Sequence, residues 1–248
     1  MSQTEMIKDG HLGGYIRGGD PGTWCPNLWT FAVREFGVQS VLDVGCGEGH
    51  STRFFQELGC LSHGVDGCPK AIADSVLPGQ VSLHDFCTGG FEAPHAVDLI
   101  WSCEFLEHVD EAYLPNILQT FAQARRAIMV THAFPGQKGH HHVNCQPSSY
   151  WIQRIESLGF TCDIGLTRKA RTTSLMDYER INHFGRGGLV FVRNDSAAPK
   201  TSWLDPVRAS FKSWRINIGL RWSGPFLEHR RRLRQLKRRR RSAEIEQR

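Results

Sequence analysis

Apolar and polar positions along the middle of the chain follow two different rhythms. Seven short apolar runs predict strands at 40–45, 61–66, 81–86, 97–104, 127–132, 160–166 and 188–192. Segments with apolar residues at helical spacing predict helices at 51–58, 69–76, 115–124 and 148–158. Strands that alternate with helices are joined by crossovers, so this order predicts an α/β fold with a mostly parallel, seven-stranded sheet.

The pattern changes between the last two predicted strands. The stretch 167–187 is polar and basic, and its apolar residues show no helical spacing. We therefore expect a non-helical connection there, folded over one end of the sheet. Such a connection lets the strand at 188–192 pair antiparallel with its neighbour and close the sheet.

The periodic part of the chain is flanked by two regions of different composition. Residues 1–37 contain a glycine-dense stretch and then a helical pattern, which predicts an N-terminal lid and helix. Residues 38–193 hold the alternating pattern and are expected to bind the ligand. Residues 194–248 are predicted to form a linker and a basic, amphipathic, helical tail.

Charge is concentrated in that tail. The whole chain has 30 basic and 25 acidic residues, but 14 of the basic and only 4 of the acidic ones lie in 201–248. At helical spacing an arc of about 80° collects the apolar side chains Val207, Phe211, Trp214, Ile218 and Trp222. The tail over 207–241 is therefore expected to bind an anionic membrane surface or the phosphates of a nucleic acid. Packing of its apolar stripe on the rest of the protein is the third alternative.

The eight cysteines and the lack of long apolar segments bear on the compartment. The cysteines form no CxxC pair, which indicates free thiols in a reducing environment. No segment approaches the roughly 20 apolar residues that span a bilayer. We expect a cytoplasmic protein without a transmembrane segment, in which the tail would permit peripheral contact with a membrane.

The first predicted strand leads into a turn with a glycine at every second position, VLDVGCGEG at 41–49. Asp43 lies in the strand, and Gly45, Gly47 and Gly49 follow before a predicted helix. Such a turn brings a ligand close to bare backbone and points N–H groups of the helix start at it. A dinucleotide-binding dehydrogenase would instead show the spacing G-x-G-x-x-G.

Polar residues at the ends of the next two strands indicate which ligand this turn binds. Asp66 ends the second strand, where a carboxylate can accept hydrogen bonds from both hydroxyls of a ribose. Asp85 and Phe86 end the third, offering an acid for an exocyclic amine and an aromatic face for a purine. Because these strands are parallel, their ends are expected to meet in one crevice.

These motifs, in this order, resemble those of the class I S-adenosylmethionine-dependent methyltransferases, over roughly 38–193. The resemblance implies a Rossmann-like fold with S-adenosylmethionine as cofactor. The residues that it places around the cofactor are Asp43, Gly45, Cys46, Gly47, Gly49, Asp66, Gly67, Asp85, Phe86, Cys103 and Glu104.

Candidates for work on the methyl acceptor follow the fourth and fifth strands. The spacing E-x-x-E-H places Glu104, Glu107 and His108 on nearly one face of a helical turn. Histidines follow the fifth strand at His132, His140, His141 and His142. As general bases we single out His108, His132 and His142; a structural role for the Glu–His run is the alternative.

The E-x-x-E-H run also looks like that of ubiquinone-pathway O-methyltransferases and small-RNA 2′-O-methyltransferases, which bind a divalent cation. The resemblance implies a metal site of Glu104, Glu107, His108 and one further histidine, of which we select His142. Carboxylates with imidazoles suit Fe²⁺ or Zn²⁺ better than Mg²⁺ or Mn²⁺.

The function predicted from the sequence is methyl transfer, with an oxygen of a small molecule, a sugar or a glycolipid-type, lipid-linked compound as acceptor. Two alternatives stay open. One is an RNA-directed methyltransferase that captures its substrate with the basic tail. The other is a non-catalytic scaffold that binds the cofactor.

Overall fold

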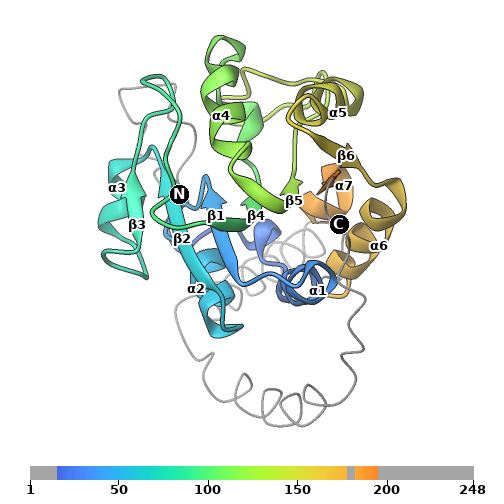
Figure 1. Cartoon of the computed structure of the whole chain (residues 1–248). Helices are drawn as coiled ribbons and strands as arrows, with labels where there is room; N and C mark the ends of the chain where they lie inside the picture. Colours follow the sequence, from blue (N-terminus) through green and yellow to red (C-terminus); the bar gives the residue numbers. More distant parts are fainter. Residues whose placement is uncertain (1–15, 178–181, 195–248) are drawn as a thin grey trace, which may run out of the picture. The chain divides into compact units, whose positions relative to one another are not determined.

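The computed structural model describes residues 16–177 and 182–194 (Figure 1). The predicted tail at 207–241 and the first part of the predicted lid lie outside the described residues. The strands are β1 (Ser40–Val44), β2 (Leu61–Asp66), β3 (Val81–Leu83), β4 (Val97–Ser102), β5 (Ala124–Val130), β6 (Phe160–Cys162) and β7 (Leu189–Arg193). Among the described residues, no helix is both long and apolar enough to cross a membrane.

The seven strands form one sheet in the order β3-β2-β1-β4-β5-β7-β6. β1 pairs in parallel with β2 and β4, and β4 pairs in parallel with β5. β7 runs antiparallel to both β5 and β6. The predicted Rossmann-like sheet, mostly parallel with an antiparallel last strand, is confirmed.

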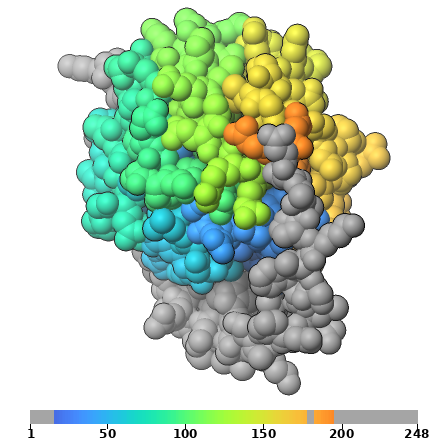
Figure 2. All heavy atoms as spheres, in the orientation of Figure 1, coloured from blue at the N-terminus to red at the C-terminus, as the bar shows by residue number. Residues whose placement is uncertain are grey.

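Helices cover both faces of this sheet (Figure 1). α4 and α5 lie side by side on one face, as the space-filling view also shows (Figure 2). α1 and α2 lie on the other face. The helices are α1 (Pro26–Phe36), α2 (His50–Glu57), α3 (Pro69–Ala73), α4 (Leu114–Phe121), α5 (Ser148–Glu156), α6 (Ile164–Leu175) and α7 (His183–Gly187).

The connection before β7 corrects the sequence-based expectation. Residues 167–187 were expected to be non-helical, yet most of α6 and all of α7 lie there. Asp163 begins α6 as its N-cap and accepts a hydrogen bond from Leu166 N at 2.8 Å. The residues that α6 buries are Thr167, Ala170 and Ser174. Their spacing is helical, but because they are small or polar the apolar pattern does not reveal it.

The core lies around the two central strands. Every residue of β1 and of β4 is buried, as expected for parallel strands with helices on both faces. Trp101 in β4 packs its ring on Phe184 of α7 at 5.5 Å between ring centroids and on Trp29 of α1 at 5.9 Å. The short helix α7 is thereby held against the centre of the sheet.

Two leucines at different places in the sheet test this description of the core. Leu99 in β4 has no exposed surface, whereas Leu61 at the start of β2 is 59% exposed. We expect Leu99→Ala to lower the free energy of unfolding by about 2–5 kcal/mol, because it leaves a cavity. Leu61→Ala should change it by no more than about 0.5 kcal/mol. Urea unfolding measures both, and similar losses in the two variants would contradict the packing described.

Candidate active site

Two glycines of the turn after β1 adopt backbone conformations that side chains rarely take. Gly45 has φ +76° and Gly47 has φ +55°. A Cβ at Gly45 would lie 2.7 Å from the side chain of Phe105, so this glycine permits close packing. A Cβ at Gly47 would meet no atom of the described residues within 4 Å. Gly47 is therefore where a ligand can approach bare backbone.

Three N–H groups of this turn, which precede the helix start, are engaged within the protein. Gly45 N and Cys46 N both donate to Val65 O, at 2.9 and 3.2 Å. Gly47 N donates to Asp66 Oδ2 at 2.8 Å. These three amides thus tie β1 to the end of β2, while the backbone surface at Gly47 stays open.

Asp43 is buried beneath the glycine turn and binds two hydroxyls of α2. Its side chain is 1% exposed, and Oδ2 accepts hydrogen bonds from Ser51 Oγ at 2.5 Å and Thr52 Oγ1 at 2.7 Å. Burial raises the pKa of Asp43 to about 6, although both hydroxyls favour the charged form. The structure therefore places this predicted cofactor residue where it orients the start of α2.

Asp66 combines fixed geometry with unused acceptor capacity. Its Oδ2 accepts from Gly47 N and its Oδ1 from Cys68 N, each at 2.8 Å. Burial raises its pKa, and these N–H groups oppose that shift. The Gly67 N–H also favours the charged form. A carboxylate has about four acceptor positions, so capacity remains for a hydrogen bond from a ribose hydroxyl. Together with the open backbone at Gly47, these residues fit the nucleoside part of S-adenosylmethionine.

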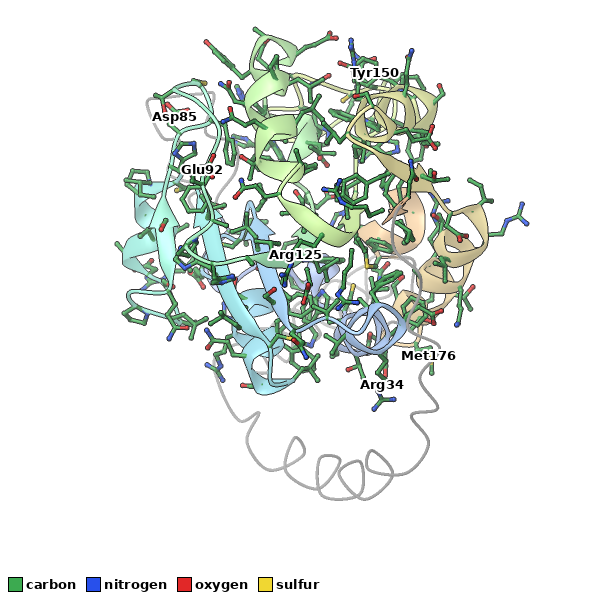
Figure 3. The ribbon with its side chains drawn as sticks, viewed as in Figure 1. Arg34, Asp85, Glu92, Arg125, Tyr150 and Met176 are labelled. Carbon is green, nitrogen blue, oxygen red and sulfur yellow. The ribbon has the colours of Figure 1, made fainter. Side chains whose placement is uncertain are left out.

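The predicted adenine contacts lie on the loop after β3. Figure 3 shows Asp85 on this loop, where its Oδ1 accepts from Cys87 N at 2.8 Å. Phe86 is 4% exposed and belongs to the hydrophobic core. Its ring packs on Phe105 at 5.3 Å between centroids. Phe86 therefore connects the core with the residue that covers Gly45.

The two glutamates of the E-x-x-E-H run occupy different environments. Glu104 has φ +55° and lies outside the helical turn that comes next in the chain. Its N donates to Thr131 Oγ1 at 2.7 Å. Its Oε2 lies 2.9 Å from His183 Nδ1. Glu104 nevertheless lies close enough to Glu107 to raise the pKa of that carboxyl, although only Glu107 belongs to the helical turn.

Glu107 is a buried carboxylate close to Glu104. It has no exposed surface, and neither carboxylate oxygen has a partner among the described residues. Burial, followed by repulsion from Glu104, raises its pKa to about 8. An unpaired carboxyl in such a position is costly, which makes a bound cation a natural occupant of the space beside it.

His108 and His142 lie next to Glu107. Each of these three residues offers one potential ligand atom, and the three atoms lie within 4.8 Å of one another. His108 Nδ1 lies 3.3 Å from His141 O, and His142 Nδ1 lies 3.2 Å from Gln137 O. Backbone carbonyls commonly orient metal-binding histidines in this way. Burial lowers the pKa of His108 to about 4 and so favours its neutral, metal-binding form.

The structure thus brings together three of the four predicted metal ligands. A carboxylate with two imidazoles is a donor set typical of Zn²⁺ and of Fe²⁺, so the residues present fit a divalent cation. Glu104 is engaged by His183 and Thr131 instead.

His132, a predicted general base, lies apart from this group. It is 3% exposed, and its ring nitrogens lie 3.0 Å from Ser148 Oγ and 3.3 Å from Ala133 O. These contacts tie the end of β5 to the start of α5. Of the neighbouring histidines, His140 is exposed, and His141 contributes its backbone carbonyl to His108.

The remaining predicted contacts are buried cysteines. Cys46 and Cys103 are each 8% exposed, and burial raises the pKa of both thiols. One site residue, His183, was missed by the sequence analysis. It lies 79 residues from Glu104 in the chain, and no motif surrounds it.

Comparison with known proteins identifies the domain that carries this site. Residues 42–129 match the model of a family described as a methyltransferase domain. This part of the chain is therefore similar to a methyltransferase domain. The match includes the glycine turn, Asp66 and the E-x-x-E-H run.

Individual proteins are more distantly similar to this chain. The mitochondrial ubiquinone biosynthesis O-methyltransferase of Schizosaccharomyces pombe is 27% identical over 106 residues, 39% of either chain. The match therefore spans about two fifths of that relative's length. Two solved structures have a TM-score of 0.50 and share the fold, covering 71% of this chain and 89% of theirs. They are a TehB-like methyltransferase of Corynebacterium glutamicum, 17% identical, and a sugar N-methyltransferase of Streptoalloteichus, 16% identical.

Asp66 provides the direct test of the cofactor site in this methyltransferase domain. We expect Asp66→Ala to weaken binding of S-adenosylhomocysteine on the order of tenfold or more, because hydrogen bonds to a charged group contribute ~1.5–3 kcal/mol each. Calorimetry measures the affinity, and circular dichroism checks that the fold persists. The exposed Glu57 of α2 gives the matched control, Glu57→Ala. Equal affinities of the two variants would remove Asp66 from the cofactor site.

Proposed function

We propose that this chain transfers a methyl group from S-adenosylmethionine to an oxygen of a small molecule, a sugar or a glycolipid-type acceptor. The proposal further places a divalent cation on Glu107, His108 and His142. The observation that carries it is the buried carboxyl of Glu107, which lacks a partner among the described residues although two imidazoles lie beside it.

The position of this cluster supports a role at the acceptor. Glu107 and His108 follow β4, and β4 is the parallel neighbour of β1, which leads into the glycine turn. The cluster therefore lies at the same edge of the sheet as the cofactor residues, on the side away from Asp66. An acceptor between the two would face both the methyl donor and the cation ligands.

The requirements of the reaction fit these residues. S-adenosylmethionine, when bound, supplies a methyl group on a positively charged sulfur. A divalent cation, when bound, supplies a Lewis acid that favours loss of the proton from an acceptor hydroxyl. The chain's own part is to grip the ribose through Asp66, to hold the backbone open at Gly47 and to keep His108 neutral for binding.

The choice of oxygen as methyl acceptor has one further support. The Schizosaccharomyces pombe relative is an O-methyltransferase by its name. Its similarity is distant, so the acceptor rests mainly on the cation cluster.

The cation site is tested by binding, independently of activity. We expect Glu107→Gln to weaken the binding of Zn²⁺ to the purified, metal-free full chain by more than the roughly 10–100-fold that outer partners of a metal site contribute. Titration calorimetry with Zn²⁺, and separately with Mn²⁺, gives the affinities.

Glu111→Gln is the matched control for this titration. Glu111 lies close in the chain but is exposed, with Tyr150 Oη at 2.6 Å. Its substitution should leave the metal affinity unchanged. If Glu107→Gln and Glu111→Gln bind Zn²⁺ equally well, the cluster does not hold a cation.

The acceptor is found by labelling. Extracts incubated with the full chain and S-adenosylmethionine carrying a labelled methyl group should yield a product labelled on oxygen, identified by mass spectrometry. A chelator and Glu107→Gln should each suppress it, and treatment of the extract with ribonuclease should not. A label on nitrogen or carbon, on RNA, or at full yield in chelator would contradict the proposal.

A further inference from the structure

His183 lies between two carboxylates from distant parts of the chain. Its Nε2 is 2.9 Å from Asp20 Oδ2, and its Nδ1 is 2.9 Å from Glu104 Oε2. Asp20 belongs to the segment before α1, Glu104 follows β4, and His183 is the first residue of α7. A single imidazole ring therefore joins three elements.

This arrangement requires a charged ring. An imidazole whose two nitrogens both face carboxylate oxygens must donate from both, which only the imidazolium does. Burial opposes the charge, but the hydrogen bonds to Asp20 and Glu104 raise the pKa of His183 to about 10. The contact is thus a pair of charge-assisted hydrogen bonds, the stronger kind.

Asp20 is held firmly on its own side of the contact. Its Oδ1 accepts from Gly22 N at 2.7 Å, and its carbonyl accepts from Thr23 Oγ1 at 2.8 Å. A Cβ at Gly22 would lie 2.5 Å from the ring of His183. The turn at residues 20–23 therefore closes directly on the ring.

The same segment is fastened at a second place, on the glycine turn. Gly18 N lies 3.0 Å from each carboxylate oxygen of Glu48. Glu48 belongs to the turn after β1 and is 6% exposed, and His50 Nε2 lies 2.9 Å from its Oε2. Residues 18–22 thus run from the turn after β1 to the turn after β4. Because β1 and β4 are neighbours, the segment crosses the carboxyl ends of the two central strands, where ligands of such sheets bind.

Glu104 receives its orientation from this contact. Its backbone is in the left-handed region, which a non-glycine residue keeps only when its surroundings hold it there. Thr131 holds its N–H and lies 3.2 Å from Oε1. His183 holds Oε2. Without the His183 ring, Oε2 of Glu104 would lose this contact.

We propose that His183 is a positioning residue that fastens residues 18–22 over the cofactor crevice and, with the same ring, fixes the carboxylate of Glu104 beside the acceptor. The proposal rests on the cofactor crevice of the proposed function, but on neither the cation nor the acceptor oxygen.

The experiment compares His183→Gln and Asp20→Asn with Arg186→Ala in the full chain. Arg186 lies on α7 and is exposed. The first readout is the dissociation rate of S-adenosylhomocysteine by stopped flow. We expect His183→Gln to raise it on the order of tenfold to a hundredfold, as for loss of a charged hydrogen bond, and Arg186→Ala to leave it unchanged.

The second readout is tryptic cleavage after Arg17, whose side chain is 81% exposed. Cleavage there, identified by mass spectrometry, should accelerate by a similar factor in His183→Gln, with or without ligand, whereas cleavage after Arg53 in α2 should not. S-adenosylhomocysteine should dissociate no faster from the double variant His183→Gln/Asp20→Asn than from His183→Gln alone, because both changes break the same contact. Because the contact also stabilises the fold, the midpoint of urea unfolding should be lower in His183→Gln than in Arg186→Ala, so the comparison of cleavage after Arg17 with cleavage after Arg53 is the one that decides.

Each other result overturns a defined statement. If the rates of ligand dissociation and of cleavage after Arg17 in His183→Gln stay within twofold of those of the unaltered chain, the ring does not fasten the segment. Equal acceleration after Arg17 and Arg53 would show a merely structural role. Cleavage measured without ligand depends only on whether residues 18–22 are held by His183, so it tests this proposal by itself. A chain that fails to bind the cofactor would instead overturn the proposed function.

Discussion

The parallel pairing of β1 with β2 and β4 is the constraint on which the site depends. Parallel strands end at the same edge of a sheet, so the residues just after each strand lie together although they are far apart in the sequence. The glycine turn comes after β1, Asp66 ends β2 and the Glu–His run comes after β4. The order of strands then arranges these groups side by side, with Asp66 on one side of the glycine turn and the Glu–His run on the other.

Much of this arrangement could be predicted because it depends on local signals. The glycines, Asp66 and the cluster of Glu107, His108 and His142 all lie at strand ends or in loops that apolar periodicity locates. The sheet could be predicted for the same reason. Its last connection could not, since α6 buries threonine, alanine and serine rather than large apolar residues.

The features that the sequence did not predict depend on how separate segments of the chain meet. The amides of Gly45 and Cys46 are bound by the neighbouring strand, through Val65 O, which the glycine spacing does not show. Glu104 lies close to Glu107, as the spacing suggests, but its left-handed backbone also brings its carboxylate to His183. His183 itself carries no local signal, because its role exists only after Asp20 and Glu104 have been brought to it. Such contacts are decided by tertiary packing rather than by spacing.

The carboxylate of Glu48 has a kinetic consequence. It belongs to the cofactor turn, yet it accepts a hydrogen bond from Gly18 in the segment that crosses the crevice. If residues 18–22 cover the bound cofactor as proposed, exchange of spent for fresh cofactor requires that contact to break and form again in every catalytic cycle. In enzymes with such a covering segment, its opening rate sets a ceiling on turnover, however fast the chemical step is.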